Sequence, residues 1–182
     1  NTNRMVEEYT ERFYLPAILQ WNWLAAENWS ETRKLAEWRR RIAATWKEVR
    51  ITALGSDPGA HHLVGDKLKV QAHVHLGSLT DDDVNVELFY GPLTPEGEIV
   101  DAATATLIPA GRTPNGQTVF EGAIQCASTG HHGFAVRVLP YHRGLIDKFS
   151  PGLVTWLEEP FQRLGLGHFK AQPAMHPVAG KV

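Results

Sequence analysis

The stretch Lys67-Leu68-Lys69-Val70-Gln71-Ala72-His73-Val74-His75-Leu76 decides the fold class of this chain. Apolar side chains occupy every second position, and Lys, Gln and His residues fill the positions between them. Successive side chains of a β-strand point to opposite faces, so this alternation predicts a strand with one buried side and one side facing solvent.

The same period of two recurs on both sides of that stretch. Turn residues such as Gly, Pro, Asn and Asp separate the candidate strands. Together with residues 67–76 these strands number about seven and predict a mainly antiparallel, immunoglobulin-like β-sandwich over residues 50–157, with barrel closure as the alternative. The further candidates are Arg50 to Leu54, Val84 to Tyr90, Ile99 to Ile108, Thr118 to Cys126, Phe134 to Leu139 and Leu153 to Leu157.

Residues 1–49 follow a helical period instead, so the fold class is α+β. We expect two helices in this segment. The first begins at Asn3, and Pro16 should end or kink it because proline lacks a backbone N–H. The second begins near Asn28 or Ser30, which are both cap-forming residues. The first apolar stripe is Met5, Val6, Tyr9 and Phe13, and the second is Leu35, Trp38, Ile42, Trp46 and Val49.

Tryptophans crowd the connection between the two predicted helices. Trp21, Trp23 and Trp29 lie there, and two helices alone offer little room to bury all three. We take these three residues as a candidate surface for docking on a partner domain. A stacking platform for sugar rings and a junction that closes the helices onto the sheet are the other two interpretations.

No pattern in the sequence marks a catalytic, cofactor-binding or metal-binding residue. His73 and His75 leave the same face of a strand, but a metal would need a third ligand from elsewhere, and we interpret both as exposed strand positions. The pairs His61-His62 and His131-His132 are expected in solvated turns. The run Asp81-Asp82-Asp83 lacks the alternating ligands of a calcium loop and is interpreted as a solvated turn.

Composition limits the partners. The 182 residues carry a net charge of −2 and are 43% hydrophobic, which gives no electrostatic reason to expect nucleic acid and no apolar run long enough to cross a membrane. The single cysteine, Cys126, is expected to be a small buried side chain and fits a reducing, cytoplasmic compartment. The chain opens within a helix and without Met, so we expect it to be cut from a larger protein. Residues 158–182 are expected to form an irregular tail.

Several segments, taken in order, support a family resemblance. The series resembles the C-terminal end of the bacterial short-type α-glucan (glycogen or maltodextrin) phosphorylases, from about residue 4 to residue 157. Its segments include Arg4-Met-Val-Glu-Glu-Tyr, Phe13-Tyr-Leu-Pro-Ala, Trp38-Arg-Arg-Arg-Ile, Val84-Asn-Val-Glu-Leu-Phe-Tyr-Gly-Pro-Leu and Gly130-His-His-Gly-Phe-Ala-Val-Arg-Val-Leu-Pro-Tyr-His.

The resemblance implies that the parent enzyme releases glucose 1-phosphate from α-1,4-glucan by phosphorolysis, using pyridoxal phosphate bound to a lysine. No position here matches that lysine or the phosphate-binding residues, so no catalytic residue is assigned and no cofactor is expected in this chain. The chain is then a non-catalytic C-terminal portion that acts as a structural and docking domain. Its partner would be the catalytic domain of the same polypeptide, on which residues 1–49 would pack.

As a structural domain, the chain could also make a homo-oligomer contact. Two other functions stay open at this point. The β-domain could be a carbohydrate-binding module that holds α-glucan near a catalytic domain. A separate metal-dependent enzyme would rest on the histidines alone.

Overall fold

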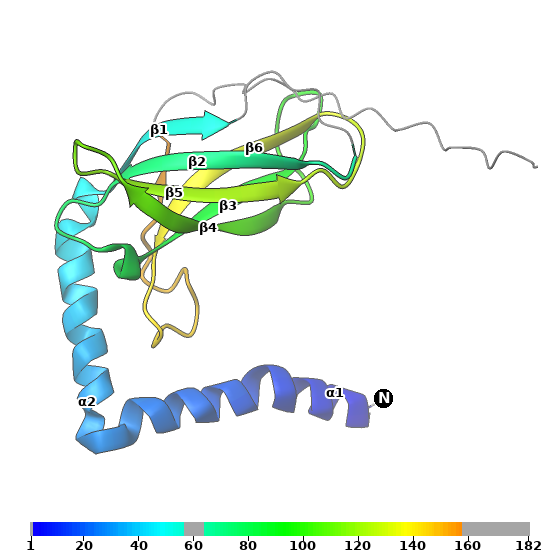
Figure 1. Ribbon diagram of the computed structural model, residues 1–182. Coiled ribbons are helices and arrows are strands. Elements are labelled where there is room, and N and C mark those ends of the chain that lie inside the picture. The colour runs from blue at the N-terminus through cyan, green and yellow to red at the C-terminus, as the bar shows by residue number, and fades with distance from the viewer. Residues whose placement is uncertain (1, 57–63, 158–182) are drawn as a thin grey trace, which may run out of the picture. The chain divides into compact units, whose positions relative to one another are not determined.

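A computed structural model describes residues 2–56 and 64–157 (Figure 1). The chain divides into two compact units. One, here called the helical unit, consists of Asn1–Val49, Leu76–Asn85 and Leu139–Val154. The other, the sheet unit, contains Arg50–His75, Val86–Val138 and, among the described residues, 155–157.

The helical unit begins with one long helical run. It contains α1 (Thr2–Tyr9), the π-helical turn η1 (Thr10–Tyr14), α2 (Leu15–Thr45) and the 3₁₀ turn η2 (Trp46–Glu48). Pro16 is the second residue of α2, which directly follows the π-helical turn. The Leu15 N–H donates to the Thr10 carbonyl, five residues back, so a wider turn precedes the proline. The expectation of two helices divided at Pro16 is therefore wrong, because the helical backbone continues through that residue.

The run is instead bent between Ala26 and Trp29. Ala26 is extended (φ −59°, ψ 154°), and Glu27, Asn28 and Trp29 have positive φ angles of 49°, 54° and 63°. This left-handed turn, here called the bend, separates a first arm (residues 2–25) from a second arm (residues 30–49). The predicted cap formers, Asn28 and Ser30, lie at or next to the bend.

The two arms differ in burial. On the second arm Trp38, Ile42, Trp46 and Val49 are buried and Leu35 is half-buried, which confirms the predicted apolar stripe. On the first arm every residue of the predicted stripe is exposed, from Tyr9 at 51% to Phe13 at 58%. The amphipathic pattern predicted that this stripe would be buried, but no described residue covers it.

The sheet contains seven strands in the order β1-β2-β5-β4-β3-β6-β7. Figure 1 labels β1 to β6. The strand predictions are confirmed except at the fourth, which begins at Ala103 rather than Ile99. Ile99 instead forms an isolated bridge with Leu93. The strands are β1 (Arg50–Ser56), β2 (Lys67–His75), β3 (Val84–Pro92), β4 (Ala103–Arg112), β5 (Thr118–Gln125), β6 (His132–Pro140) and β7 (Thr155–Trp156).

The predicted immunoglobulin-like sandwich is wrong. All seven strands belong to one hydrogen-bonded antiparallel sheet, and its two edge strands, β1 and β7, approach each other, so the sheet nearly closes into a barrel. Register irregularities at Ile51/Ala53 and Pro109/Gly111 bend the strands that carry them. The alternation of apolar and polar residues is the same in a sandwich and in a closed sheet, so it could not separate them.

Buried apolar side chains of the strands form the core of the sheet unit. One finding departs from the alternation: Glu87 on β3 and Arg137 on β6 occupy predicted solvent positions, yet only 3% and 8% of their surfaces are exposed. Arg137 Nη2 donates to Glu87 Oε2 at 2.8 Å, and the guanidinium lies 5.4 Å from the Phe89 ring and 5.6 Å from the Trp156 ring. The apolar core includes Val70, Ala72, Val74, Val86, Leu88, Leu107, Phe120, Val136 and Val138.

Candidate functional site

The first arm presents a run of large apolar side chains to solvent. Their exposed fractions range from 49% for Leu15 to 68% for Leu19, and the Tyr9 and Phe13 rings lie 5.5 Å apart at helical spacing. A helix that exposes this many large apolar side chains more often marks an interaction site than a chance feature. The first-arm apolar face consists of Met5, Val6, Tyr9, Phe13, Tyr14, Leu15, Ile18, Leu19 and Trp21.

The three predicted docking tryptophans have different environments. Trp21 and Trp29 are 60% and 41% exposed, and their rings meet edge to face at 5.2 Å. Trp23 is half-buried instead: the Arg143 guanidinium lies 4.9 Å above its ring, and a methyl group added at Gly144 would come within 2.5 Å of that ring. Trp21 and Trp29 therefore face outward, while Trp23 packs on the turn formed by residues 142–144.

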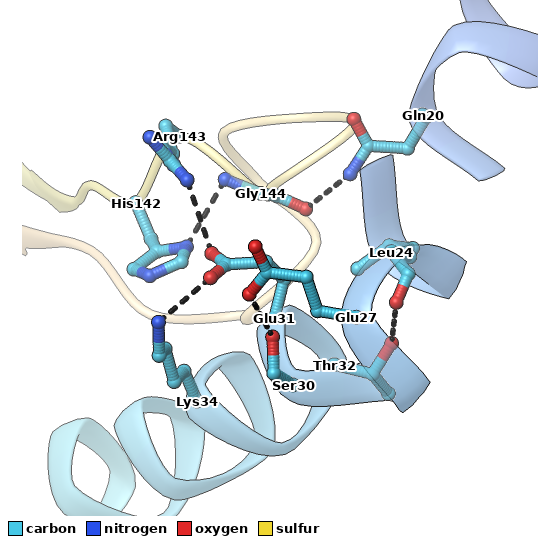
Figure 2. Close-up of polar contacts among 10 residues, drawn as sticks. All are labelled: Gln20, Leu24, Glu27, Ser30, Glu31, Thr32, Lys34, His142, Arg143 and Gly144. Atoms are coloured by element: carbon cyan, nitrogen blue, oxygen red, sulfur yellow. Dashed lines mark hydrogen bonds and ion pairs between the residues drawn. The ribbon is translucent and has the colours of Figure 1, made fainter. Parts of the chain in front are cut away.

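Hydrogen bonds join the two arms on either side of the bend to each other and to the 142–144 turn (Figure 2). Across the bend itself, Thr32 Oγ1 donates to the Leu24 carbonyl at 2.9 Å. Gln20 Nε2 of the first arm donates to the Gly144 carbonyl at 2.7 Å. Glu31 of the second arm accepts hydrogen bonds from Arg143 Nη2 at 3.1 Å and from Lys34 Nζ at 2.7 Å. The 142–144 turn thus touches both arms.

His142 lies at the centre of this arrangement. Its Nδ1 accepts the Gly144 N–H at 3.0 Å, and its ring centroid lies 6.4 Å from Trp23 and 5.0 Å from Trp38. Burial, and after it the neighbouring Arg143 charge, lowers the pKa of His142, while the Glu31 and Asp83 carboxylates raise it by less. These surroundings favour the neutral imidazole over the charged form.

Asp83 anchors the second arm to the short turn η3 (Asp81–Asp83). Its Oδ1 accepts hydrogen bonds from Trp38 Nε1 at 3.0 Å and Arg41 Nη2 at 2.6 Å, and its Oδ2 accepts from Arg41 Nη1 at 2.9 Å. Burial raises the pKa of Asp83, but the hydrogen bonds from Arg41 and Thr80 lower it by more, so the pKa lies below its usual value of 3.8.

Sequence reasoning missed Asp83. The interpretation of Asp81-Asp82-Asp83 as a solvated turn holds for Asp82, which is exposed, but is wrong for Asp83, which is 6% exposed. Thr80 precedes Asp83 by three residues, and the two form a reciprocal capping box. That spacing was a pattern in the sequence from which the buried role could have been inferred.

The remaining candidates do not converge. Within residues 2–56 and 64–157, no three His, Cys, Asp or Glu side chains gather where they could hold a metal ion. His73 and His75 are half-buried on β2, and His61 and His62 lie outside the described residues. Cys126 is buried, as predicted, and burial raises the pKa of its thiol. In the part of the chain that the structure describes, no helix is long and apolar enough to cross a membrane.

These residues define a nearly closed β-sheet domain preceded by a bent helical arm with an exposed apolar face. The chain belongs to the glycogen phosphorylase C-terminal domain family, whose model matches residues 46–158. This confirms the resemblance seen in the sequence.

Two curated relatives show the extent of the match. A glycogen phosphorylase of Mycobacterium tuberculosis is 31% identical over 158 residues, which cover 84% of this chain and 18% of the relative. A maltodextrin phosphorylase of Thermococcus litoralis is 30% identical over 161 residues, covering 86% of this chain and 18% of that relative. The chain therefore spans less than a fifth of the length of these relatives. Both matches must also extend into α2, because residues 46–182 alone make up a smaller share of the chain than is covered.

Proposed function

We propose that this chain is the non-catalytic C-terminal portion of an α-glucan phosphorylase and that it docks on the preceding, catalytic part of the same polypeptide. The contact would be made by the first-arm apolar face together with Trp29. The supporting observation is the exposure of that face, which lies in the first helical run of a chain that spans 18% of its relatives. A partner of the same polypeptide would be joined directly to this arm.

Burial of this face would supply enough free energy for stable docking. Transfer of one large apolar side chain out of water contributes about 1.5–3 kcal/mol. Phe13, Leu19 and Trp21 are each more than half exposed, so covering them alone would contribute several kcal/mol. Because the partner is covalently attached, little of that gain is spent on bringing the two parts together.

The chemistry of the parent would then be phosphorolysis of α-1,4-glucan to glucose 1-phosphate with pyridoxal phosphate. The described residues do not fit that cofactor, because a lysine Schiff base needs an enclosed amine. Four of the described lysines are exposed, and Lys148 packs its Nζ 5.4 Å above the Phe149 ring. The four exposed lysines are Lys34, Lys47, Lys67 and Lys69. We therefore derive no catalytic step in this chain.

A carbohydrate-binding module is the alternative. Sugar stacking needs an aromatic ring with a free, exposed face. Trp156 is the partly exposed tryptophan of the sheet unit, at 40%, but its ring already contacts the Arg137 guanidinium and meets the Phe89 ring in a T-shaped arrangement. That engagement favours a packing role for Trp156 over a stacking role.

Docking can be tested by mixing the chain with the polypeptide that precedes Asn1 in the intact protein. We expect a stable complex by gel filtration and recovery of glucan phosphorolysis, neither of which the chain gives alone. The variant Phe13→Ser/Leu19→Ser/Trp21→Ser should lose the complex, because it removes apolar contact area without touching a buried residue.

The matched control is Arg33→Ser/Arg40→Ser, which changes exposed residues of the second arm and should bind normally. Equal binding by the apolar triple variant would refute docking through this face. Release of glucose 1-phosphate by the chain alone would refute the non-catalytic assignment. Saturable heat on titration with maltoheptaose would favour the carbohydrate-binding alternative.

A further inference from the structure

His142 is wedged between the two arms of the bent helix. Its ring contacts Trp23 on the first arm and Trp38 on the second, at centroid distances of 6.4 Å and 5.0 Å. The same residue fixes the turn that follows it, because its Nδ1 accepts the Gly144 N–H. Gly144 in turn accepts the side-chain hydrogen bond of Gln20 through its carbonyl (Figure 2). One imidazole thus connects the first arm, the second arm and the 142–144 turn.

This arrangement needs the neutral form of the ring. A nitrogen that accepts a backbone N–H carries no proton, so the resident tautomer is protonated on Nε2. Protonation of Nδ1 would set two donors against each other and break the hydrogen bond to Gly144. The Gly144 carbonyl would then no longer be fixed where Gln20 reaches it.

Charged groups of three elements face the ring. Arg143 on the same turn opposes protonation, whereas Glu31 of α2 and Asp83 of η3 favour it. Both carboxylates are already engaged by cations, Glu31 by Lys34 and Arg143, and Asp83 by Arg41. Because both carboxylates are paired with cations, their electrostatic attraction for a protonated His142 ring is weaker than that of free carboxylates. The flanking tryptophan rings would also attract a cation, but the loss of water around the half-buried ring acts against it.

The bend itself is a strained element. Glu27, Asn28 and Trp29 are consecutive non-glycine residues in the left-handed region, and each costs of order 1 kcal/mol relative to ordinary helix. Such a conformation persists only where surrounding contacts hold it. Residues 142–144 contact both arms next to the bend, through Gln20, Trp23 and Glu31. Loosening that turn removes these contacts and leaves the hydrogen bond from Thr32 to the Leu24 carbonyl as the contact across the bend.

We propose that His142 is a proton-sensitive pin: as a neutral ring it holds the bend and fixes the direction of the first arm, and on protonation it releases that arm. The consequence for docking rests on the proposed function above, since the first arm carries the apolar face. Mild acid would then lower the affinity of this domain for its catalytic partner.

The pin is tested on the chain alone. Spin labels at exposed positions 12 and 40 report the distance between the arms by pulsed electron paramagnetic resonance. We expect a narrow distance distribution at about pH 7.5 and a broad, shifted one at about pH 5, on either side of the histidine range. The ¹⁵N shifts of the His142 ring should show an Nε2–H tautomer at the higher pH and should titrate with the distance change.

The variant His142→Asn separates protonation from other effects of acid. An Asn side chain accepts the N–H two residues on, as in an Asx turn, but does not titrate. It should keep the narrow distribution at both pH values, while the control His131→Asn, at an exposed position, should respond like the original chain. An unchanged distribution in the original chain once the ¹⁵N shifts show a protonated His142 ring, or the same acid response in His142→Asn, would overturn the proposal.

A final comparison separates this inference from the docking proposal. Docking to the preceding polypeptide is measured at both pH values and should weaken about tenfold in acid for the original chain, but not for His142→Asn. Arm movement without any docking would refute the proposed function and leave the pin standing. Docking that weakens in acid without arm movement would refute the pin alone.

Discussion

Asp83 links α2 to the turn that precedes β3 through several hydrogen bonds. It accepts hydrogen bonds from Trp38 and Arg41 of α2 and from Thr80 of its own turn, and it is 6% exposed. A hydrogen bond to a charged group contributes about 1.5–3 kcal/mol, and loss of an acceptor leaves buried donors unpaired. We expect Asp83→Asn to lower the free energy of unfolding by about 2–4 kcal/mol in urea denaturation. Asp82→Asn changes the exposed neighbour and should cost less than about 0.5 kcal/mol.

The same contacts set a pH dependence. Because the pKa of folded Asp83 lies below 3.8, its ionised form stabilises the fold fully above that value, and the contribution is lost as the pH falls through the folded pKa. The stability difference between the original chain and Asp83→Asn should therefore stay constant from neutral pH to about pH 4 and shrink below it. A constant difference down to about pH 2 would contradict the assigned ion pair.

The Glu87–Arg137 pair makes a different prediction, because both partners are buried in the sheet unit. Removing one partner of such a pair strands a charge and costs about 3–5 kcal/mol, whereas replacing both by apolar groups is often nearly neutral. We expect Arg137→Met to be strongly destabilising and Glu87→Met/Arg137→Met to recover most of the loss, as measured by denaturant unfolding. A double variant as unstable as the sum of the two single variants would show that the charges do not act as a pair.

At the scale of the element, the bend in α2 is the feature that decides where the apolar face points. Asn28 has a φ of 54°, a conformation that glycine adopts without strain. Asn28→Gly should therefore leave stability unchanged or raise it by up to about 1 kcal/mol. The matched change Ala44→Gly lies in regular helix on the exposed side of the second arm and should cost about 1 kcal/mol. Equal losses in thermal unfolding would mean that residue 28 is ordinary helix.

The sequence predicted elements better than their assembly. Alternation located all seven strands because a half-buried strand must repeat every two residues, and the stripe ending at Val49 was right for the same kind of reason. The closure of the sheet and the burial of Glu87 and Arg137 depend on which strands pair, and local alternation carries no such information. The site was partly predictable: the exposed Trp21 and Trp29 followed from crowding, but the His142 contacts join residues more than a hundred positions apart.

At the scale of the whole molecule, the exposed first arm has a consequence that needs no partner. An uncovered apolar face lowers its free energy by meeting another copy, so the isolated 182-residue chain should self-associate reversibly with concentration. Sedimentation velocity over about 1–100 µM should show the change, a range in which weak protein interfaces form.

Phe13→Glu/Leu19→Glu should keep the chain monomeric, because two carboxylates on this face would have to be desolvated in any such contact. Arg40→Glu on the exposed side of the second arm is the control and should associate like the original chain. Under the proposed function, adding the catalytic polypeptide should also reverse the self-association, since docking and self-contact would compete for one surface. A strictly monomeric original chain across the whole range would mean that this face is already covered in solution, and it would remove the main support for docking through the first arm.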